Sequence, residues 1–265
     1  MDFLAPEDLA RMRSPALIQA HPGHELYVLG WVKLARPRIF VLTDGSGHTA
    51  RSRADSTARL IDELGATKGE VFCPLTDRAI YDATLAGDLL LFRNLLETIA
   101  GSLIANAVDF VAGDAAEGFN PTHDLCRYLV DGAVTLVKRR TGRVIPNYEI
   151  RLTTWETGKP DRHGADCLHL ELSTDSLQEK LQTAYAYQGL QTEVREHMAS
   201  CGAEHFRIEC FRKPSAGPSP YPADGPHYER VGRQRVREGV YRTALRYRDH
   251  VLPIFDAIGD YAETR

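Results

Sequence analysis

The sequence has no hydrophobic run that approaches the roughly 18 apolar residues needed to span a membrane. The first eight residues are acidic and lack the basic-then-apolar order of a signal peptide, so we expect a cytoplasmic protein with no membrane partner. There are five cysteines, an odd number without a C-x-x-C pair, which argues against a disulfide framework. The net charge of −4 gives no reason to expect a nucleic-acid partner.

What is present indicates a packed domain of the α/β class, with 265 residues of which 43% are hydrophobic and 26% charged. In the first half, four short apolar runs predict strands, at residues 15–20, 38–43, 70–74 and 107–112. Helical patterns lie between them, at residues 52–64 and 87–105, and we expect a break in the second near Gly101. Strands that alternate with helices predict a mostly parallel sheet covered on both faces.

The second half has a mixed α+β pattern and no internal repeat. We expect strands at residues 147–155, 167–173 and 205–211, and long helices at 176–198 and 228–247, the last rich in arginine. A turn over residues 158–164 and a Pro-, Gly- and Ser-rich loop over 214–226 separate these elements. We therefore divide one domain into a metal-site half, residues 1–140, and a C-terminal substrate-shaping portion, residues 141–265.

Histidines gather where predicted strands end. His21 and His24 follow the first strand, and His123 lies in a loop after the fourth, at the same edge of the sheet. Neutral imidazoles are standard zinc ligands, and three of them leave a fourth position open, as in catalytic zinc sites. For the pair alone, the alternative is that His24 caps the next helix and His21 is a semi-buried histidine without a ligand role.

A family resemblance follows from these loops. The segment Ala20-His21-Pro22-Gly23-His24-Glu25 resembles the A-H-P-D-D-E signature of the PIG-L/LmbE-like zinc N-deacetylases, and Asn120-Pro121-Thr122-His123 resembles the family's H-P-D-H segment. The resemblance covers about residues 14–212 and is weak beyond residue 140. It implies a Rossmann-like three-layer fold and a Zn²⁺ site made by His21, His24 and His123, with His24 in place of the usual aspartate.

The departures from the family pattern concern proton transfer. Gly23 occupies the position of the family's general base, and it has no group that accepts a proton. Four acids are candidates for that role, Asp44 and Asp114 first because they leave their strands toward the site, then Glu117 and Asp124; each is equally well explained as a loop-capping carboxylate. Asn120 stands where the family has a histidine that stabilises the tetrahedral intermediate, and its amide is either an oxyanion donor or part of an Asn-Pro turn.

The three histidines predict a zinc-dependent hydrolase of an amide or ester. The resemblance implies that it removes an acyl group, such as acetyl, from an N-acyl amino sugar or related small metabolite. Glu25 is a candidate partner that orients a ligand imidazole. The alternative is a catalytically impaired family member that binds metal and a sugar or protein partner without hydrolysis, as Gly23 suggests. A homo-oligomer is compatible with either function.

Overall fold

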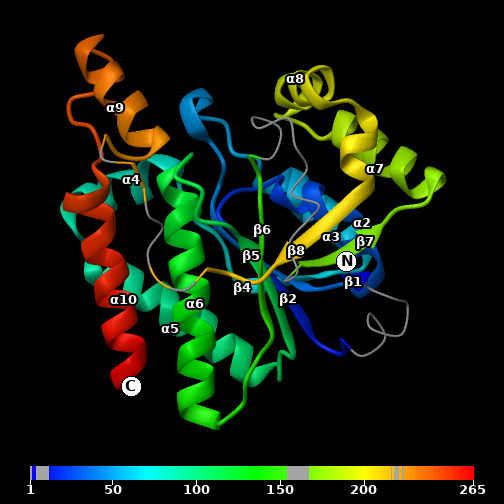
Figure 1. Ribbon diagram of the computed structural model, residues 1–265, viewed down its shortest axis with the longest axis horizontal. Helices are drawn as coiled ribbons and strands as arrows, with labels where there is room; N and C mark the ends of the chain where they lie inside the picture. Colours follow the sequence, from blue (N-terminus) through cyan, green and yellow to red (C-terminus); the bar gives the residue numbers. More distant parts are fainter. Residues whose placement is uncertain (1, 4–11, 154–166, 216, 218–220, 223) are drawn as a thin grey trace.

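The computed structural model of the protein describes residues 2–3, 12–153, 167–215, 217, 221–222 and 224–265. Within these residues, eight strands form one sheet in the order β1-β7-β8-β6-β5-β2-β3-β4 (Figure 1). The strands are β1 (Asp2–Phe3), β2 (Pro15–Gln19), β3 (Arg38–Thr43), β4 (Thr67–Leu75), β5 (Phe110–Asp114), β6 (Asn147–Ile150), β7 (Cys167–Glu171) and β8 (Ile208–Arg212). All neighbouring pairs are parallel except those of β8, which runs antiparallel to β6 and β7. The predicted α/β class with a mostly parallel, Rossmann-like sheet is confirmed.

Helices cover both faces of this sheet. The α-helices are α2 (Leu29–Ala35), α3 (Ala54–Leu64), α4 (Asp77–Ala86), α5 (Leu89–Ala105), α6 (Pro121–Thr141), α7 (Thr174–Ala186), α8 (Gln191–Cys201), α9 (His227–Arg237) and α10 (Leu252–Thr264). Shorter helical turns are η1 (His24–Val28), η2 (Gly47–Thr49), η3 (Ala203–Arg207) and η4 (Tyr247–Val251). In Figure 1, α5, α6 and α10 lie on one side of the sheet, and α2, α3 and α7 lie on the other.

Two hydrophobic cores follow from the alternation of side chains along the strands. On β2, Ile18 packs in the core below α5, α6 and α10, whereas its neighbour Leu17 packs in the core below α2, α3 and α7. On β3, Phe40 and Val41 divide in the same way. Both faces of the central strands are therefore buried, which explains their continuous apolar runs. Within the described residues, no helix combines the length and the apolar character needed to cross a membrane.

Several helix boundaries differ from the prediction, and glycine explains most of them. The expected break at Gly101 is absent, because α5 continues through it between buried Ala100 and Leu103. The single helix expected at 176–198 is two helices, α7 and α8, separated around Gly189, whose φ is 88°. The helix expected at 228–247 ends at Arg237, shortly before Gly239 with a φ of 73°. Positive φ favours glycine and ends a right-handed helix.

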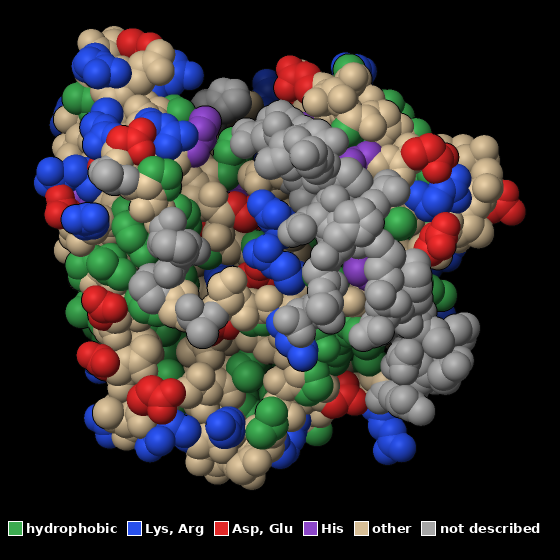
Figure 2. All heavy atoms as spheres, viewed as in Figure 1, with side chains coloured by type: hydrophobic (Ala, Val, Ile, Leu, Met, Phe, Trp, Pro, Cys, Tyr) green, Lys and Arg blue, Asp and Glu red, His purple; other side chains and the backbone are tan. Residues whose placement is uncertain are grey.

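The C-terminal portion does not form a separate layer. Its last helix, α10, which the sequence pattern did not predict, packs through Ile254 and Ile258 into the same core as α5 and α6. Over α9, acidic and basic side chains lie side by side at the surface (Figure 2), and Arg233 contacts Glu229 at 2.9 Å. Expected strand 147–155 is observed as β6 over four residues, and the expected turn at 158–164 lies outside the described residues.

The chain reverses its direction of travel across the sheet at β2. From β2 it moves outward to β3 and β4, and it then returns to β5 on the other side of β2 and continues to β6. The carboxyl ends of β2 and β5 thus flank a topological switch point, where open α/β sheets bind their ligands. The histidine loops predicted from the sequence follow these two strands.

Candidate metal centre at the switch point

The loop after β2 places His21 and His24 on a tight turn. Gly23 has a φ of 105° and begins η1 at His24. Glu25, which is fully buried, holds this turn: its carboxylate accepts hydrogen bonds from Gln19 Nε2 at 2.6 Å, Gly23 N at 2.8 Å and Thr57 Oγ1 at 2.6 Å. We expected Glu25 to orient a ligand imidazole, and this expectation is wrong, because its contacts fix the backbone of the loop.

The third histidine comes from the first turn of α6. Asn120 is the N-cap of this helix, and its Oδ1 accepts from Thr122 N at 2.9 Å. Pro121 follows at the first helical position, where its missing N–H costs no helical hydrogen bond. His123 is then directed back toward the loop after β2, across the switch point between β2 and β5.

The three rings form a compact group, which we call the histidine cluster (His21, His24 and His123). The ring centroids of His21 and His24 are 5.3 Å apart, those of His21 and His123 are 5.2 Å apart, and those of His24 and His123 are 4.7 Å apart. Zn–N bonds of about 2.0–2.1 Å in a tetrahedral site place imidazole centroids about 5 Å apart. The positions of the rings therefore suit one shared ion.

Two carboxylates hold two of these rings from behind. His21 Nδ1 lies 3.1 Å from Asp77 Oδ1 and 2.7 Å from Thr43 Oγ1, while His24 Nδ1 lies 2.8 Å from Asp114 Oδ2. A carboxylate on Nδ1 favours the tautomer with the proton there, which leaves the Nε2 lone pair for a metal. His123 is different, because its Nδ1 is buried and has no hydrogen-bond partner among the described residues.

Burial disfavours the charged form of two of the three imidazoles, and a metal ligand must be neutral. Burial lowers the pKa of His21, against the opposing effect of its hydrogen bond to Asp77. Burial also lowers the pKa of His123 well below its usual value, and the neighbouring rings of His24 and His21 add to this effect. For Asp77, burial acts to raise the pKa, but the hydrogen bonds from His21 and Thr43 outweigh it and lower that pKa. Asp77 is thus held as a carboxylate beside His21.

The nitrogens of the cluster do not converge as closely as its rings do. Among the described residues, one group of three side chains presents ligand atoms that all lie within 4.8 Å of one another, and it is made by Cys167, His169 and Cys210 instead. In the histidine cluster, Asn120 Nδ2 lies 3.3 Å from His21 Nε2 and donates to the lone pair that a metal would use. Binding one ion there requires this contact to open and at least one ring to turn.

The four acids proposed as proton acceptors occupy different surroundings. Asp114 is buried and accepts from both Ala20 N, at 2.7 Å, and His24 Nδ1, so we reassign it from proton transfer to positioning of His24. Glu117 accepts from Leu152 N at 2.7 Å and Thr153 Oγ1 at 2.5 Å.

The other two acids are also engaged in loops. Asp124 accepts from Gly118 N at 3.0 Å and Tyr221 Oη at 2.5 Å, and burial raises its pKa to about 7. Asp44 accepts from Ser46 N at 3.0 Å, which is the contact of a turn carboxylate. Each of the four candidates thus has a structural role where the structure describes it.

The structure also explains the glycine at the base position. A Cβ on Gly23 would lie 2.3 Å from Leu190 Cδ1, and the φ of 105° disfavours any side chain there. Leu190 comes from the break between α7 and α8, so the divergent second half of the chain fills the space that a base at position 23 would need. An aspartate at this position would need a strained backbone and a displaced Leu190 side chain.

Sequence reasoning missed Asp77, the acid in contact with His21. It is the first residue of α4, a helix that the apolar pattern did not predict. The available signal was its cap: Thr76 Oγ1 accepts from Ala79 N at 3.0 Å, and Gly87 ends the helix with a φ of 63°. A Thr-Asp start followed by a glycine stop therefore marks this helix in the sequence.

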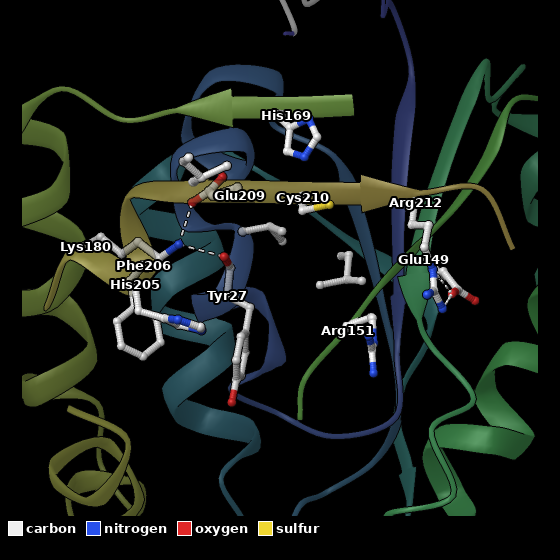
Figure 3. Close-up of a pocket in the computed structure, with 13 residues that line it drawn as sticks. Tyr27, Glu149, Arg151, His169, Lys180, His205, Phe206, Glu209, Cys210 and Arg212 are labelled. Carbon is white, nitrogen blue, oxygen red and sulfur yellow. Dashed lines mark hydrogen bonds and ion pairs between the residues drawn. The ribbon is translucent and has the colours of Figure 1, made fainter. Parts of the chain in front are cut away.

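A cavity of about 60 Å³ lies away from the three histidines, among residues of η1, β6, β7 and β8. Tyr27, Arg151, His169 and Cys210 line it (Figure 3). Close to it, the buried Lys180 Nζ donates to Glu209 Oε1 at 2.8 Å and to the carbonyl of Tyr27 at 2.6 Å. The sequence had given no reason to connect His169 with a site.

Comparison with known proteins adds little to this geometry. No family model matches the sequence, and no curated protein matches it. Among solved structures, the chain is similar to the zinc-inhibited form of the teicoplanin deacetylase Orf2, with 11% identity and a TM-score of 0.49, over 70% of this chain and 90% of that one.

Proposed function

We propose that this chain is a zinc-dependent hydrolase that removes an acyl group, acetyl in the simplest case, from an N-acyl amino sugar or a related small metabolite. One observation carries the proposal: three imidazoles meet at the switch point of the sheet, and carboxylates hold two of them through Nδ1. Metal-ligating histidines commonly have such partners. The class of substrate comes from the resemblance of the two histidine loops to the PIG-L/LmbE-like deacetylases.

The residues present fit a zinc ion. His123 Nδ1 is a buried polar atom without a partner among the described residues, and such atoms are rare unless a ligand or water satisfies them. His21, His24 and His123 would hold the ion, with Asp77 and Asp114 fixing the orientation of the first two rings. A zinc ion bound there supplies a Lewis acid that polarises an acyl carbonyl.

Asn120 is the residue we assign to the developing oxyanion. Its Oδ1 is fixed by the N-cap hydrogen bond to Thr122 N, which directs the amide Nδ2 toward His21. When His21 Nε2 is engaged elsewhere, this N–H is released and can donate to an oxygen at the cluster. The cap therefore preorganises the donor, because the amide cannot rotate without breaking it.

A second candidate function is binding without hydrolysis. The observation that favours it is that position 23 is a glycine with Leu190 packed against it, so no proton-accepting side chain stands where the resemblance would place a base. The engagement of Asp44, Asp114, Glu117 and Asp124 in structural hydrogen bonds points the same way. A protein of this kind would retain zinc and bind a sugar conjugate without turnover.

Zinc content and acetate release together separate these functions. We expect purified protein to contain zinc, to release acetate from at least one of a panel of N-acetylated amino sugars, and to lose one equivalent of zinc and its activity in His24→Ala. The matched control is His250→Ala in η4, which should retain both. Zinc without turnover on any substrate would favour the binding function, and full zinc occupancy in His24→Ala would refute the ligand assignment.

A further inference from the structure

We propose that Cys167, His169 and Cys210 form a second metal site, selective for a thiophilic cation such as Zn²⁺ and separate from the histidine cluster. We call these residues the strand Cys/His group. Their ligand atoms, one from each residue, all lie within 4.8 Å of one another. None of the five cysteines forms a disulfide.

Strand register brings the three residues together. In the antiparallel pair β7/β8, His169 lies directly opposite Cys210, and Cys167 lies opposite Arg212. Cys167 and His169 are two residues apart and therefore share one face of β7, and Cys210 is on the corresponding face of β8. Their neighbours Leu170 and Phe211 point to the other face, into the core below α2 and α7. The three donors thus gather on one face by backbone geometry.

The chemistry of the donors selects the ion. Thiolates and imidazole together suit zinc, whereas hard cations such as Mg²⁺ and Ca²⁺ prefer oxygen. Two thiolates and a neutral imidazole balance the charge of Zn²⁺, which matters because His169 is fully buried and Cys167 is 2% exposed. A complex without net charge avoids the cost of burying an ion. Zn–S bonds of about 2.3 Å require only short inward movements of these side chains.

A disulfide is the main competing use of two close thiols, and the register disfavours it. Cys167 and Cys210 are diagonal rather than directly opposite. Diagonal residues on antiparallel strands have Cα atoms about 7–8 Å apart, whereas disulfides need about 4.4–6.8 Å. A metal ion bridges this longer separation, since it adds two bonds between the sulfurs.

Two of the three donors border a cavity. His169 and Cys210 both line the cavity of about 60 Å³, together with Tyr27 and Arg151 (Figure 3). This volume holds a few water molecules. Three protein ligands and one accessible position are typical of zinc sites that exchange a ligand, whereas purely structural sites use four protein ligands. The site is therefore suited to bind a small exogenous donor, with water as the default.

Cobalt(II) is the probe that separates the two sites, because cobalt–thiolate bonds absorb strongly in the near ultraviolet and cobalt–imidazole bonds do not. Reduced, metal-stripped protein titrated with Co²⁺ should develop this absorption, and zinc should then displace it. Cys210→Ser should abolish the band and lose one zinc equivalent per chain. Cys201→Ser, a matched control in α8, should retain both, and His24→Ala should retain the band.

Each outcome decides the proposal. Absence of the band in reduced wild-type protein, or its persistence at wild-type intensity in either Cys210→Ser or Cys167→Ser, would overturn it. A Cys167–Cys210 disulfide found by mass spectrometry in metal-free protein would do the same. Since a variant that fails to fold also loses the band, far-ultraviolet circular dichroism is recorded for each one. Failure of the hydrolase proposal appears instead as loss of turnover with the cobalt band intact.

Discussion

The two candidate metal centres are built in opposite ways. The histidine cluster stands on loops that follow β2 and β5, and its rings are held by side chains, Asp77 for His21 and Asp114 for His24. The strand Cys/His group stands on two paired strands, and its donors are held by backbone register. Loops adjust more easily than strands, so ligands on loops need supporting hydrogen bonds to keep their orientation.

The two sites should therefore respond differently when side chains near the donors are substituted. The histidine cluster should be sensitive to its supporting carboxylates, and the strand Cys/His group should be insensitive to any single side chain outside its donors. One residue, Lys180, also contacts segments that belong to both sites. Lys180 of α7 contacts both the carbonyl of Tyr27, three residues after His24, and Glu209, the neighbour of Cys210.

We expect the largest effect, a loss in the free energy of unfolding, from Lys180→Met, which removes the ammonium group that contacts both segments. Glu209 is fully buried and also accepts from Gly30 N and Trp31 N, each at 2.8 Å. Removal of the ammonium leaves a buried carboxylate without its cation, which typically costs about 3–5 kcal/mol. Urea denaturation should show this loss in the free energy of unfolding.

The control is Lys33→Met, which breaks an exposed pair with Glu179 in which both side chains are 51% exposed. Exposed pairs contribute about 0–1 kcal/mol, so this variant should unfold close to wild type. Similar losses of unfolding free energy in Lys180→Met and Lys33→Met would mean that the contacts of Lys180 with Tyr27 and Glu209 do not stabilise the fold. Retention of the cobalt–thiolate band in folded Lys180→Met would show that the strand Cys/His group does not depend on it.

The histidine cluster could be predicted from the sequence, whereas the strand Cys/His group could not. The histidine cluster follows a local pattern: apolar runs mark β2 and β5, and ligands of an α/β sheet gather at the carboxyl ends of its strands. The meeting of His21, His24 and His123 was therefore predictable, although β5 proved to end at Asp114 rather than residue 112. Whether they bind zinc stays a prediction.

The strand Cys/His group was not predictable, because it depends on which residue of β8 lies opposite His169. Strand register over a separation of 41 residues, from His169 to Cys210, is not encoded in any local spacing. The break between α7 and α8 escaped prediction for a related reason: Tyr187, the residue after α7, donates from its Oη to Thr57 Oγ1 at 2.6 Å, since the Thr57 hydroxyl itself donates to Glu25. Tertiary contacts here override a continuous helical pattern.

The second prediction tests the dependence of the histidine cluster on its carboxylates. Asp114→Asn keeps the size of the side chain but removes the charge that fixes the His24 tautomer. Loss of such a partner typically weakens metal binding by about 10–100-fold. Competition with a chelator should show weaker zinc binding at this site, while the cobalt–thiolate band of the strand Cys/His group stays unchanged.

Asp82→Asn is the matched control for this comparison, because Asp82 pairs with Arg78 at the surface of α4 and is half exposed. It should leave zinc affinity at both sites as in wild type. Equal affinity in Asp114→Asn and Asp82→Asn would mean that the loop ligands keep their orientation without a carboxylate, and the distinction between loop-built and strand-built sites would fail.

The smallest effect concerns the missing base, and Gly23→Asp tests it. The new side chain would meet Leu190 Cδ1 at 2.3 Å from a backbone with a φ of 105°, so we expect a loss of about 1–3 kcal/mol in unfolding free energy and no gain in acetate release. Gly142→Asp separates the two causes, because Gly142 has a φ of 73° but no atom within 4 Å of a Cβ, and it reports backbone strain alone. Compared with Leu190→Ala alone, Gly23→Asp/Leu190→Ala should lose less unfolding free energy than Gly23→Asp does in wild type, by the part that comes from the collision with Leu190. If the double variant also gains turnover, the second half of the chain has closed a position at which this fold can still place a base.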